Sequence, residues 1–233
     1  MKNRAFTVLV LMTMSLFVSA DDHGSDMSVT TYYNFSTANQ AEVVAAITKF
    51  ASSDCRKEMP ARIRVLQNHF NGYEEATHTV LIGYASPADM QKSLQLMSSC
   101  DAMQEMMSAM ATLTKPVSQS MAIPLLTGGD VSKDSVYMVW QLSIDDEATY
   151  LEAYGKLMKA QIEAGIVNGG WGLMRVGGGA DSEITHIAYS GAQDLTALLQ
   201  SRNPSPAFAS FQKTMAEVRT VTRLAVNFVM ADL

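Results

Sequence analysis

Two histidines at matching places in the chain have the side chain best suited to chemistry. His78 ends the phrase Ala76-Thr77-His78, and His186 ends Ile184-Thr185-His186, which lies 108 residues further on. An imidazole can ligate a metal or a haem iron, or act as a general base. No carboxylate or cysteine lies at metal-ligand spacing to either histidine, so we expect no metal site. The alternative is that both phrases reflect duplication, with each histidine hydrogen-bonded or at a strand end.

Strand alternation divides the neighbours of His78 into two faces. Val80, Ile82 and Tyr84 share its face, whereas Thr77, Thr79 and Leu81 share the other. We expect the His78 face to line a space between two sheets; the alternative places it under helices, with the threonine face inside. Core packing is the competing interpretation of every pocket candidate. The candidates for a ligand pocket are His78, His186, Tyr33, Arg64, Asn68, Tyr84, Trp140, Trp171 and Tyr189.

A methionine-rich run begins at Cys100. Soft sulfur ligands suit Cu(I), which makes a copper site one interpretation. Met103, Met106 and Met110 follow 3-4-7 spacing, however, and that spacing is typical of the apolar stripe of a helix. The pattern therefore favours core packing, for which methionine is a common filler.

Several catalytic motifs do not occur in the sequence. There is no Gly-rich phosphate loop, no G-x-S-x-G, no H-E-x-x-H and no paired C-x-x-C. Gly177-Gly178-Gly179 falls at a predicted hairpin and does not precede a helix, so it predicts no dinucleotide site. Catalytic residues stay unassigned.

Residues 1–20 have the composition of a secretory signal peptide. Lys2 and Arg4 precede an apolar run from Ala5 to Val18, and Val18-Ser19-Ala20 supplies small residues before the expected cleavage site. The apolar run is too short for the alternative, an uncleaved membrane anchor. No later segment has 18 uninterrupted apolar residues, so we expect a periplasmic or secreted protein without a stable anchor.

The charge balance disfavours nucleic acid as a partner. The chain has 17 basic and 23 acidic residues, and loss of the signal would move the formal charge from −6 to −8. Binding to phosphates requires a basic surface. With 48% hydrophobic residues the chain can bury a core.

Cys55 and Cys100 are predicted to form a disulfide. An even number of cysteines in an exported chain indicates pairing, because exported compartments are usually oxidising. The alternative is a reactive thiol, which needs a neighbouring base or a helix start to lower its pKa.

The two halves of the chain match at a spacing of about 107 residues. Short β-branched and aromatic segments predict strands, and 3-4 apolar spacing predicts helices. Thr37 and Gln40 form a predicted capping box, and Asn71-Gly72 predicts a hairpin turn. The matching segments are the opening strands Val29–Phe35 and Val136–Leu142, the helices Gln40–Ser53 and Glu147–Ala164, the hairpins Arg62–Tyr84 and Gly172–Ser190, the later helices Asp101–Thr114 and Pro206–Val221, and the closing strands Val117–Leu125 and Thr222–Met230.

This order predicts an α+β fold of two tandem ferredoxin-like β-α-β-β-α-β units. One unit leaves a sheet face bare, and a second copy can bury it. The expected divisions are the signal at 1–20, a first repeat at 21–127, a linker at 128–134 and a second repeat at 135–233. Both cysteines fall at one end of the first unit, and Ser205 takes the place of Cys100 in the second.

The chain resembles the dimeric α+β barrel superfamily in a fused form with its sheets packed together. The resemblance spans nearly all of residues 28–230, and the segment 203–211 is similar to a Ser-Pro-x-aromatic phrase common there. No motif of one subfamily is present. In cofactor-independent oxygenases of this superfamily, polar barrel residues surround an aromatic substrate, so the resemblance implies such a pocket.

Three functions compete at this stage. The leading hypothesis is an exported protein that binds a small apolar or aromatic ligand between its sheets. The second is an enzyme, either cofactor-independent and monooxygenase-like or haem-dependent, built on His78 or His186. The third is a ligand-free interaction module. No cofactor is expected apart from haem under the second hypothesis, and an oligomer is compatible with all three.

Overall fold

Eight strands and seven α-helices make up the described chain. The structure, a computed structural model, describes residues 27–181, 183–201 and 205–233, so the predicted signal peptide lies outside the described residues. The strands are β1 (Val29–Ser36), β2 (Arg62–Phe70), β3 (His78–Tyr84), β4 (Lys115–Gly128), β5 (Val136–Ile144), β6 (Trp171–Gly178), β7 (His186–Ala192) and β8 (Arg219–Asp232). The helices are α1 (Gln40–Ala51), α2 (Asp54–Glu58), α3 (Pro87–Ser99), α4 (Asp101–Leu113), α5 (Glu147–Glu163), α6 (Leu195–Gln200) and α7 (Pro206–Thr214), with a 3-10 helix, η1 (Val131–Lys133).

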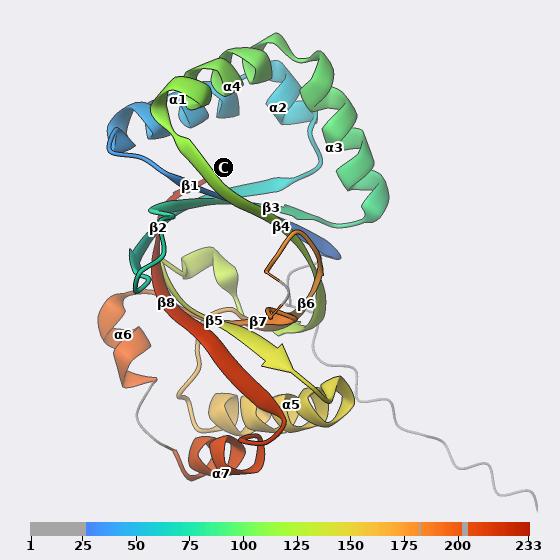
Figure 1. Ribbon diagram of the computed structural model, residues 1–233, viewed down its shortest axis with the longest axis vertical. Coiled ribbons are helices and arrows are strands. Elements are labelled where there is room, and N and C mark those ends of the chain that lie inside the picture. The colour runs from blue at the N-terminus through green and yellow to red at the C-terminus, as the bar shows by residue number, and fades with distance from the viewer. Residues whose placement is uncertain (1–26, 182, 202–204) are drawn as a thin grey trace, which may run out of the picture.

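The strands close into one antiparallel barrel in the order β1-β3-β2-β8-β5-β7-β6-β4 (Figure 1). The α+β barrel that the resemblance implied is therefore present, with its strands in one closed sheet. β2 pairs with β8, and β4 pairs with β6, which joins the two halves edge to edge. Closure satisfies the backbone groups that open sheet edges would leave unpaired.

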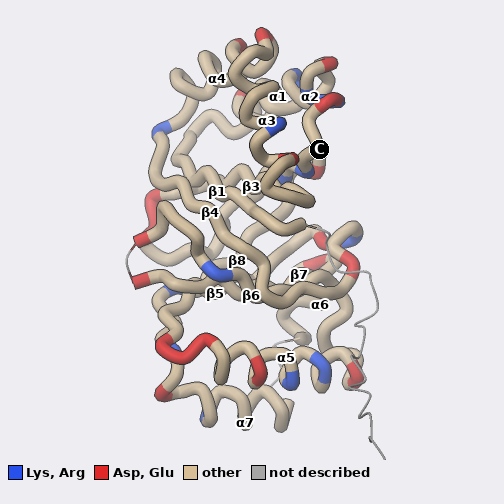
Figure 2. Tube along the Cα trace, turned by 90° about the vertical axis from the view of Figure 1, so that its right-hand side faces the viewer, with Lys and Arg blue, Asp and Glu red and all other residues tan. Residues whose placement is uncertain are grey.

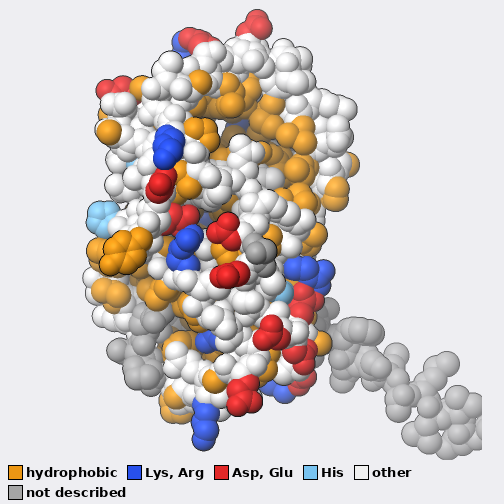
Figure 3. All heavy atoms as spheres, viewed as in Figure 1, with side chains coloured by type: hydrophobic (Ala, Val, Ile, Leu, Met, Phe, Trp, Pro, Cys, Tyr) orange, Lys and Arg blue, Asp and Glu red, His pale blue; other side chains and the backbone are white. Residues whose placement is uncertain are grey.

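Two helical layers cover opposite sides of the barrel. α1 to α4 lie over the strands of the first half, and α5 and α7 lie over those of the second (Figures 1 and 2). Charged residues are found mainly on the helices and loops (Figure 2). Apolar side chains gather around a hollow beneath the first helical layer (Figure 3). Among the described residues, no helix is long and apolar enough to cross a membrane.

The outer face of β3 carries His78, and this corrects the predicted orientation. Thr79 and Leu81 line the barrel interior. Ile82 and Tyr84 pack outward, in a core cluster with Phe50 of α1. The physical reason is that the wholly apolar stripe is buried by the apolar faces of the helices, so the mixed threonine face turns inward.

Side chains cap the starts of several helices. Ser86 accepts a hydrogen bond from the Asp89 backbone N–H at 3.1 Å. The Sγ of Cys100 and the Oγ of Ser205, which occupy matching positions in the two halves, cap α4 and α7 in the same way. The capping box predicted at Thr37 is wrong, because the N-cap of α1 is Asn39 and no side chain of the described residues caps that helix. The Thr37 hydroxyl instead accepts the Asn39 backbone N–H at 2.9 Å and donates to the Leu113 carbonyl at 2.8 Å.

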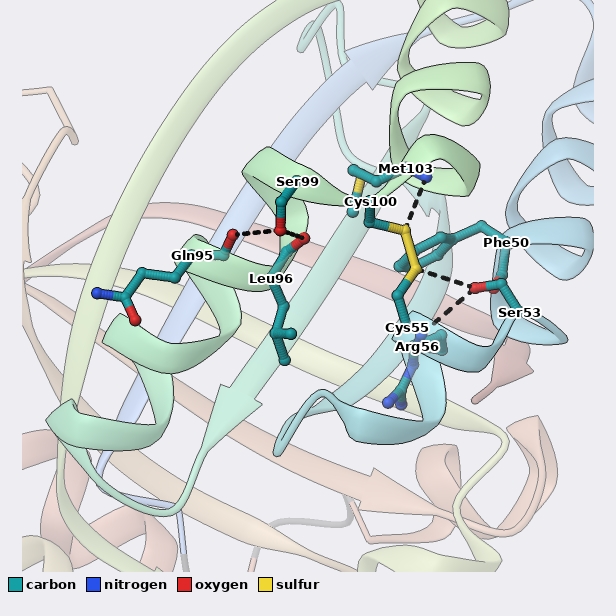
Figure 4. Close-up of a disulfide and its surroundings, with 9 residues drawn as sticks. All are labelled: Phe50, Ser53, Cys55, Arg56, Gln95, Leu96, Ser99, Cys100 and Met103. Carbon is teal, nitrogen blue, oxygen red and sulfur yellow. Dashed lines mark hydrogen bonds between the residues drawn. A yellow bond between two sulfur atoms is a disulfide. The ribbon is translucent and has the colours of Figure 1, made fainter.

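The predicted Cys55–Cys100 disulfide is present (Figure 4). It joins α2 to the start of α4, with Cα atoms 6.2 Å apart and a sequence separation of 45. The Cys100 sulfur also accepts the Met103 backbone N–H at 3.2 Å. Met103 is 7% exposed and packs beside Phe50, which supports the packing interpretation of the methionine run.

Candidate ligand cavity inside the barrel

The barrel interior contains a cavity of about 120 Å³ to which all eight strands contribute. Inward positions alternate along each strand with outward positions that pack under helices. The strand residues that line it are Thr30, Tyr32, Asn34, Arg62, Arg64, Leu66, Asn68, Thr79, Leu81, Ser120, Tyr137, Val139, Gln141, Met174, Ile187, Tyr189, Arg223, Ala225 and Asn227.

The middle of the cavity wall is apolar. Leu66, Leu81, Val139 and Ile187 face it from four strands, and Met174 faces it from a fifth. Apolar walls with a few placed polar groups are typical of sites for small organic molecules.

Arg64 anchors one end of the cavity. Its side chain is 8% exposed, and its Nη2 donates to Asp232 Oδ2 and to the Val131 carbonyl, both at 2.7 Å. Its Nη1 donates to the Tyr137 hydroxyl. Burial alone would raise the pKa of the Asp232 carboxyl, but bonds to Arg62 and Arg64 outweigh it and lower that pKa. The pair therefore stays ionised and fixes strands β2, β5 and β8 to η1.

Tyr137 extends this network to Asp134. Its hydroxyl is hydrogen-bonded to the Asp134 carboxylate, which also accepts the Gly170 backbone N–H at 2.9 Å. Burial raises the pKa of both Tyr137 and Asp134. A Cβ on Gly191 would lie 2.1 Å from Asp134 Oδ2, so this carboxylate requires glycine beside it.

The opposite end of the cavity is held by amides and an ion pair. The Thr79 hydroxyl donates to Asn34 Oδ1 at 2.6 Å, and Asn34 Nδ2 donates to Ser118 Oγ at 2.9 Å. Arg223 pairs with Glu74, which lies in the turn between β2 and β3. The two ends are thus polar, and the apolar belt lies between them.

Three polar atoms that line the cavity are buried without a hydrogen-bond partner. They are Thr30 Oγ1, Gln141 Oε1 and Asn227 Oδ1. The Tyr32 hydroxyl has only a weak hydrogen-bond acceptor, because it donates to the Met174 thioether at 3.1 Å. Buried polar atoms normally have partners, so each of these can receive a group from a bound molecule.

The structure separates the candidates into two groups. Arg64, Asn68 and Tyr189 line the barrel cavity. Tyr33 and Tyr84 pack outward in the core of the first half. Those side chains cannot reach the barrel interior, because strand alternation turns them the other way.

The tryptophans also face the helices. Trp140 lines a second cavity beneath α5 and α7. Trp171 packs beside Tyr154, with ring centroids 6.1 Å apart, and its ring lies against Gly128. Among the glycines beside Trp171, Gly169 lies close to the Gly191 carbonyl and Gly172 lies against the Tyr189 ring, so a Cβ at either position would clash.

Neither histidine lines the barrel cavity or the second cavity. His78 stacks on Phe35 with centroids 5.6 Å apart, and its Nδ1 lies 2.8 Å from Thr77 Oγ1. His186 makes the same 2.8 Å contact with Thr185, and its Nε2 lies 2.9 Å from Glu147 Oε2. This geometry matches the duplication interpretation, in which each histidine is hydrogen-bonded or lies at a strand end.

Glu147 joins His186 to the surface. Its carboxylate accepts from Arg175 as well as His186, and the bond to Arg175 is the main reason that its pKa falls to about 2. Among the described residues, no group of three or more His, Cys, Asp or Glu side chains could hold a metal.

Tyr32, Tyr137, Asp134 and Asp232 were not identified as site residues from the sequence. The available signal was the repeat itself, since Thr30, Tyr32 and Asn34 alternate on β1 as Tyr137, Val139 and Gln141 do on β5. Polar residues at alternate places in an apolar strand indicate the inward face.

The second cavity, of about 240 Å³, lies between the outer face of the barrel and the helices α5 and α7. Aromatic rings dominate it, including Tyr150, Tyr154 and Phe211. Arg219 donates to the Tyr150 hydroxyl at 3.0 Å and lies over the Phe211 ring. Gln161 is 5% exposed, and its Oε1 has no partner.

Comparison with known proteins identifies the class of fold. No protein-family model matches the chain, and no curated protein matches it in sequence. Solved structures do match, and they are dimeric α+β barrel proteins. At identities of this order the likeness shows the fold alone.

Three of these structures illustrate the match. A proposed monooxygenase from Fusobacterium nucleatum is 9% identical with a TM-score of 0.63, covering 88% of this chain and 94% of that one. A proposed monooxygenase from Lactobacillus acidophilus is 8% identical with a TM-score of 0.60, covering 89% and 98%. A heme-binding protein from Thermus thermophilus is 10% identical with a TM-score of 0.54, covering 88% and 92%.

Proposed function

We propose that the protein binds a small, largely apolar or aromatic molecule inside its barrel. The observation that carries this proposal is the set of unpartnered buried atoms on Thr30, Gln141 and Asn227 around an apolar belt. A hollow interior also disfavours the interaction module with a filled barrel. Arg64, Asn68 and Tyr189 belong to the proposed site.

Binding is favoured over catalysis because the ionised groups of the cavity are engaged with one another. Arg64 donates to Asp232, Val131 and Tyr137, and Arg223 pairs with Glu74. Groups held in this way shape and orient a cavity, and they are poorly placed to exchange protons with a substrate.

A cavity-filling substitution tests the proposal. Ala225→Leu adds three carbon atoms to a residue that lines the cavity, whereas Thr220→Leu places the same side chain at an exposed position on the same strand. We expect ethylbenzene, titrated calorimetrically, to bind the wild type and Thr220→Leu but not Ala225→Leu. Undiminished binding by Ala225→Leu would place the ligand elsewhere.

The second candidate function is oxygenation of a small aromatic compound in the cavity beneath α5 and α7. The unpartnered Gln161 Oε1 among aromatic rings favours it, as do the fold relatives described as monooxygenases. Oxygen uptake with phenolic substrates should then fall on Gln161→Leu. Uptake that is absent, or equal in both proteins, would remove this candidate.

Haem does not fit either cavity. No histidine or cysteine is among the described residues that line them, and these are the usual axial ligands. The phenols of Tyr150 and Tyr154 are engaged with Arg219 and with the Gly172 carbonyl. We therefore derive no haem chemistry for this chain.

We also propose that the chain is two tandem ferredoxin-like units, 21–127 and 135–233, exported by the signal at 1–20. Support comes from the equivalent caps at Cys100 and Ser205 and from an element order that repeats after η1. The disulfide is in keeping with an oxidising compartment. Amino-terminal sequencing of exported protein should begin at Asp21.

A further inference from the structure

Three guanidinium groups around the barrel cavity, those of Arg62, Arg64 and Arg223, are matched by three carboxylates. Arg62 and Arg64 share Asp232, and Arg223 pairs with Glu74. The third carboxylate is that of Asp134, which interacts with Arg64 and is hydrogen-bonded to Tyr137. No unpaired cation or carboxylate is among the described residues that line the cavity. A charged molecule would thus lose its hydration without gaining a counter-charge, which is costly.

Tyr32 is the hydrogen-bond donor in this cavity with the weakest partner. Its hydroxyl donates to the Met174 thioether at 3.1 Å, and a thioether is a poor acceptor. Burial raises the pKa of Tyr32, so the hydroxyl keeps its proton. Met174 is a flexible side chain that can move aside for a better acceptor.

The size and walls of the cavity suit one aromatic ring. A dry cavity of similar volume, about 150 Å³ in an engineered protein, holds benzene. Tyr137 and Tyr189 meet edge to face beside the apolar belt, with centroids 6.1 Å apart. Aromatic faces and aliphatic side chains together favour a flat apolar guest.

Resting on the proposed function, we infer that the bound molecule is uncharged, carries one aromatic ring, and offers a carbonyl oxygen to the Tyr32 hydroxyl. The carbonyl replaces the Met174 sulfur as the acceptor. The ring occupies the belt formed by Leu66, Leu81 and Val139. An aryl amide has this chemistry, since its N–H groups also suit the unpartnered oxygens of Gln141 and Asn227.

Three probes of similar size test separately the binding of an aromatic ring, the contribution of a carbonyl oxygen and the requirement for an uncharged ligand. Calorimetric titration of wild type should give a dissociation constant roughly fivefold lower for acetophenone than for ethylbenzene, as one added hydrogen bond implies. Benzoate should bind more weakly than either. Tyr32→Phe should remove the advantage of acetophenone and leave ethylbenzene binding unchanged. Tyr33→Phe, which alters the adjacent outward residue, should behave as wild type.

The outcomes distinguish this inference from the proposed function. If ethylbenzene binds and Ala225→Leu abolishes its binding, the barrel site stands. Equal binding of acetophenone by wild type and Tyr32→Phe would then overturn the carbonyl assignment alone. Benzoate as the tightest probe would overturn the requirement for an uncharged ligand. Failure of all three probes to bind would overturn both proposals.

Discussion

At the scale of single residues, Arg64 and Arg62 show how burial changes the value of an ion pair. Both guanidinium groups bind Asp232, but the Arg62 side chain is 38% exposed and that of Arg64 is 8% exposed. Exposed ion pairs contribute little to the free energy of unfolding. Breaking a buried pair costs much more, because it leaves buried polar groups without partners. The same carboxylate thus provides an internal comparison.

We expect Arg64→Met to lower the free energy of unfolding by about 3 kcal/mol. The substitution leaves Tyr137 and the Val131 carbonyl without their donor. Arg62→Met is the matched control and should cost less than about 1 kcal/mol. Urea unfolding of both variants measures this, and equal losses would contradict the role assigned to burial.

The two histidines differ in the hydrogen bonding of the Nε2 atom. His186 Nε2 faces Glu147, whereas His78 Nε2 is buried without a partner. Burial lowers the pKa of His78, so the folded protein binds its proton less tightly than the unfolded chain does. The contribution of neutral His78 to the free energy of unfolding is therefore fully present when the pH is above the ordinary histidine pKa of about 6.5. It is lost as the pH falls toward the lowered pKa of the folded protein.

Replacing His78 should thus flatten part of the acid dependence of stability. We expect the free energy of unfolding of the wild type to fall between pH 7 and pH 5 more steeply than that of His78→Gln. The variant is less stable at pH 7, because glutamine cannot reproduce the Phe35 stack. Denaturant titrations at several pH values give both slopes, and parallel slopes would show that His78 does not titrate in this range.

At the scale of elements, the disulfide fixes a short helix that the rest of the chain holds weakly. α2 has five residues, none of them buried, yet Arg56 within it donates to the carbonyls of Ala61 and Leu233 at 2.9 and 2.7 Å. The bond to Cys100 positions this guanidinium. Release of the disulfide should therefore loosen the contact between α2 and the last residue.

Substituting both cysteines by serine should lower the free energy of unfolding by about 4 kcal/mol, the chain-entropy value for a loop of this length. Urea unfolding with and without reductant measures it, since reductant should destabilise wild type and leave the variant unchanged. A wild type indifferent to complete reduction would refute the stabilising role.

Alternation and helical spacing predicted most elements closely, but they could not choose between faces. The predicted strand Val29–Phe35 and helix Glu147–Ala164 each differ from the observed bounds by one residue. β4 and β8 are longer than predicted, because pairing between the two halves extends ends such as Thr127, opposite Gly172, and Asp232, opposite Arg64. Which face of β3 points into the barrel is decided by tertiary packing, because the helices bury the more apolar face. Strand alternation alone does not contain that information.

At the scale of the whole molecule, the closed sheet makes the halves depend on each other. β8 pairs with β2 of the first half and with β5 of the second. β4 likewise pairs with β1 and β6. Neither half can unfold without breaking the strand pairs that join it to the other half.

We therefore expect a single unfolding transition. Trp140 and Trp171, the two tryptophans of the chain, both report on the second half. Exposure of the Cys55–Cys100 bond to reductant reports on the first half. Fluorescence and reductant accessibility should share one urea midpoint, which is the test of two-state behaviour. Separate midpoints would show that the halves unfold independently.

The β2–β8 seam also has a consequence during synthesis. Arg64 and Asp232 lie 168 residues apart, so the barrel cannot seal until almost the whole chain has been made. At ordinary translation rates, β2 waits roughly 10 to 30 s for its partner. Through that interval its edge is open to other nascent chains. Crowding by identical nascent chains, and chaperones that shield the edge, would then govern the yield of folded protein more than final stability does.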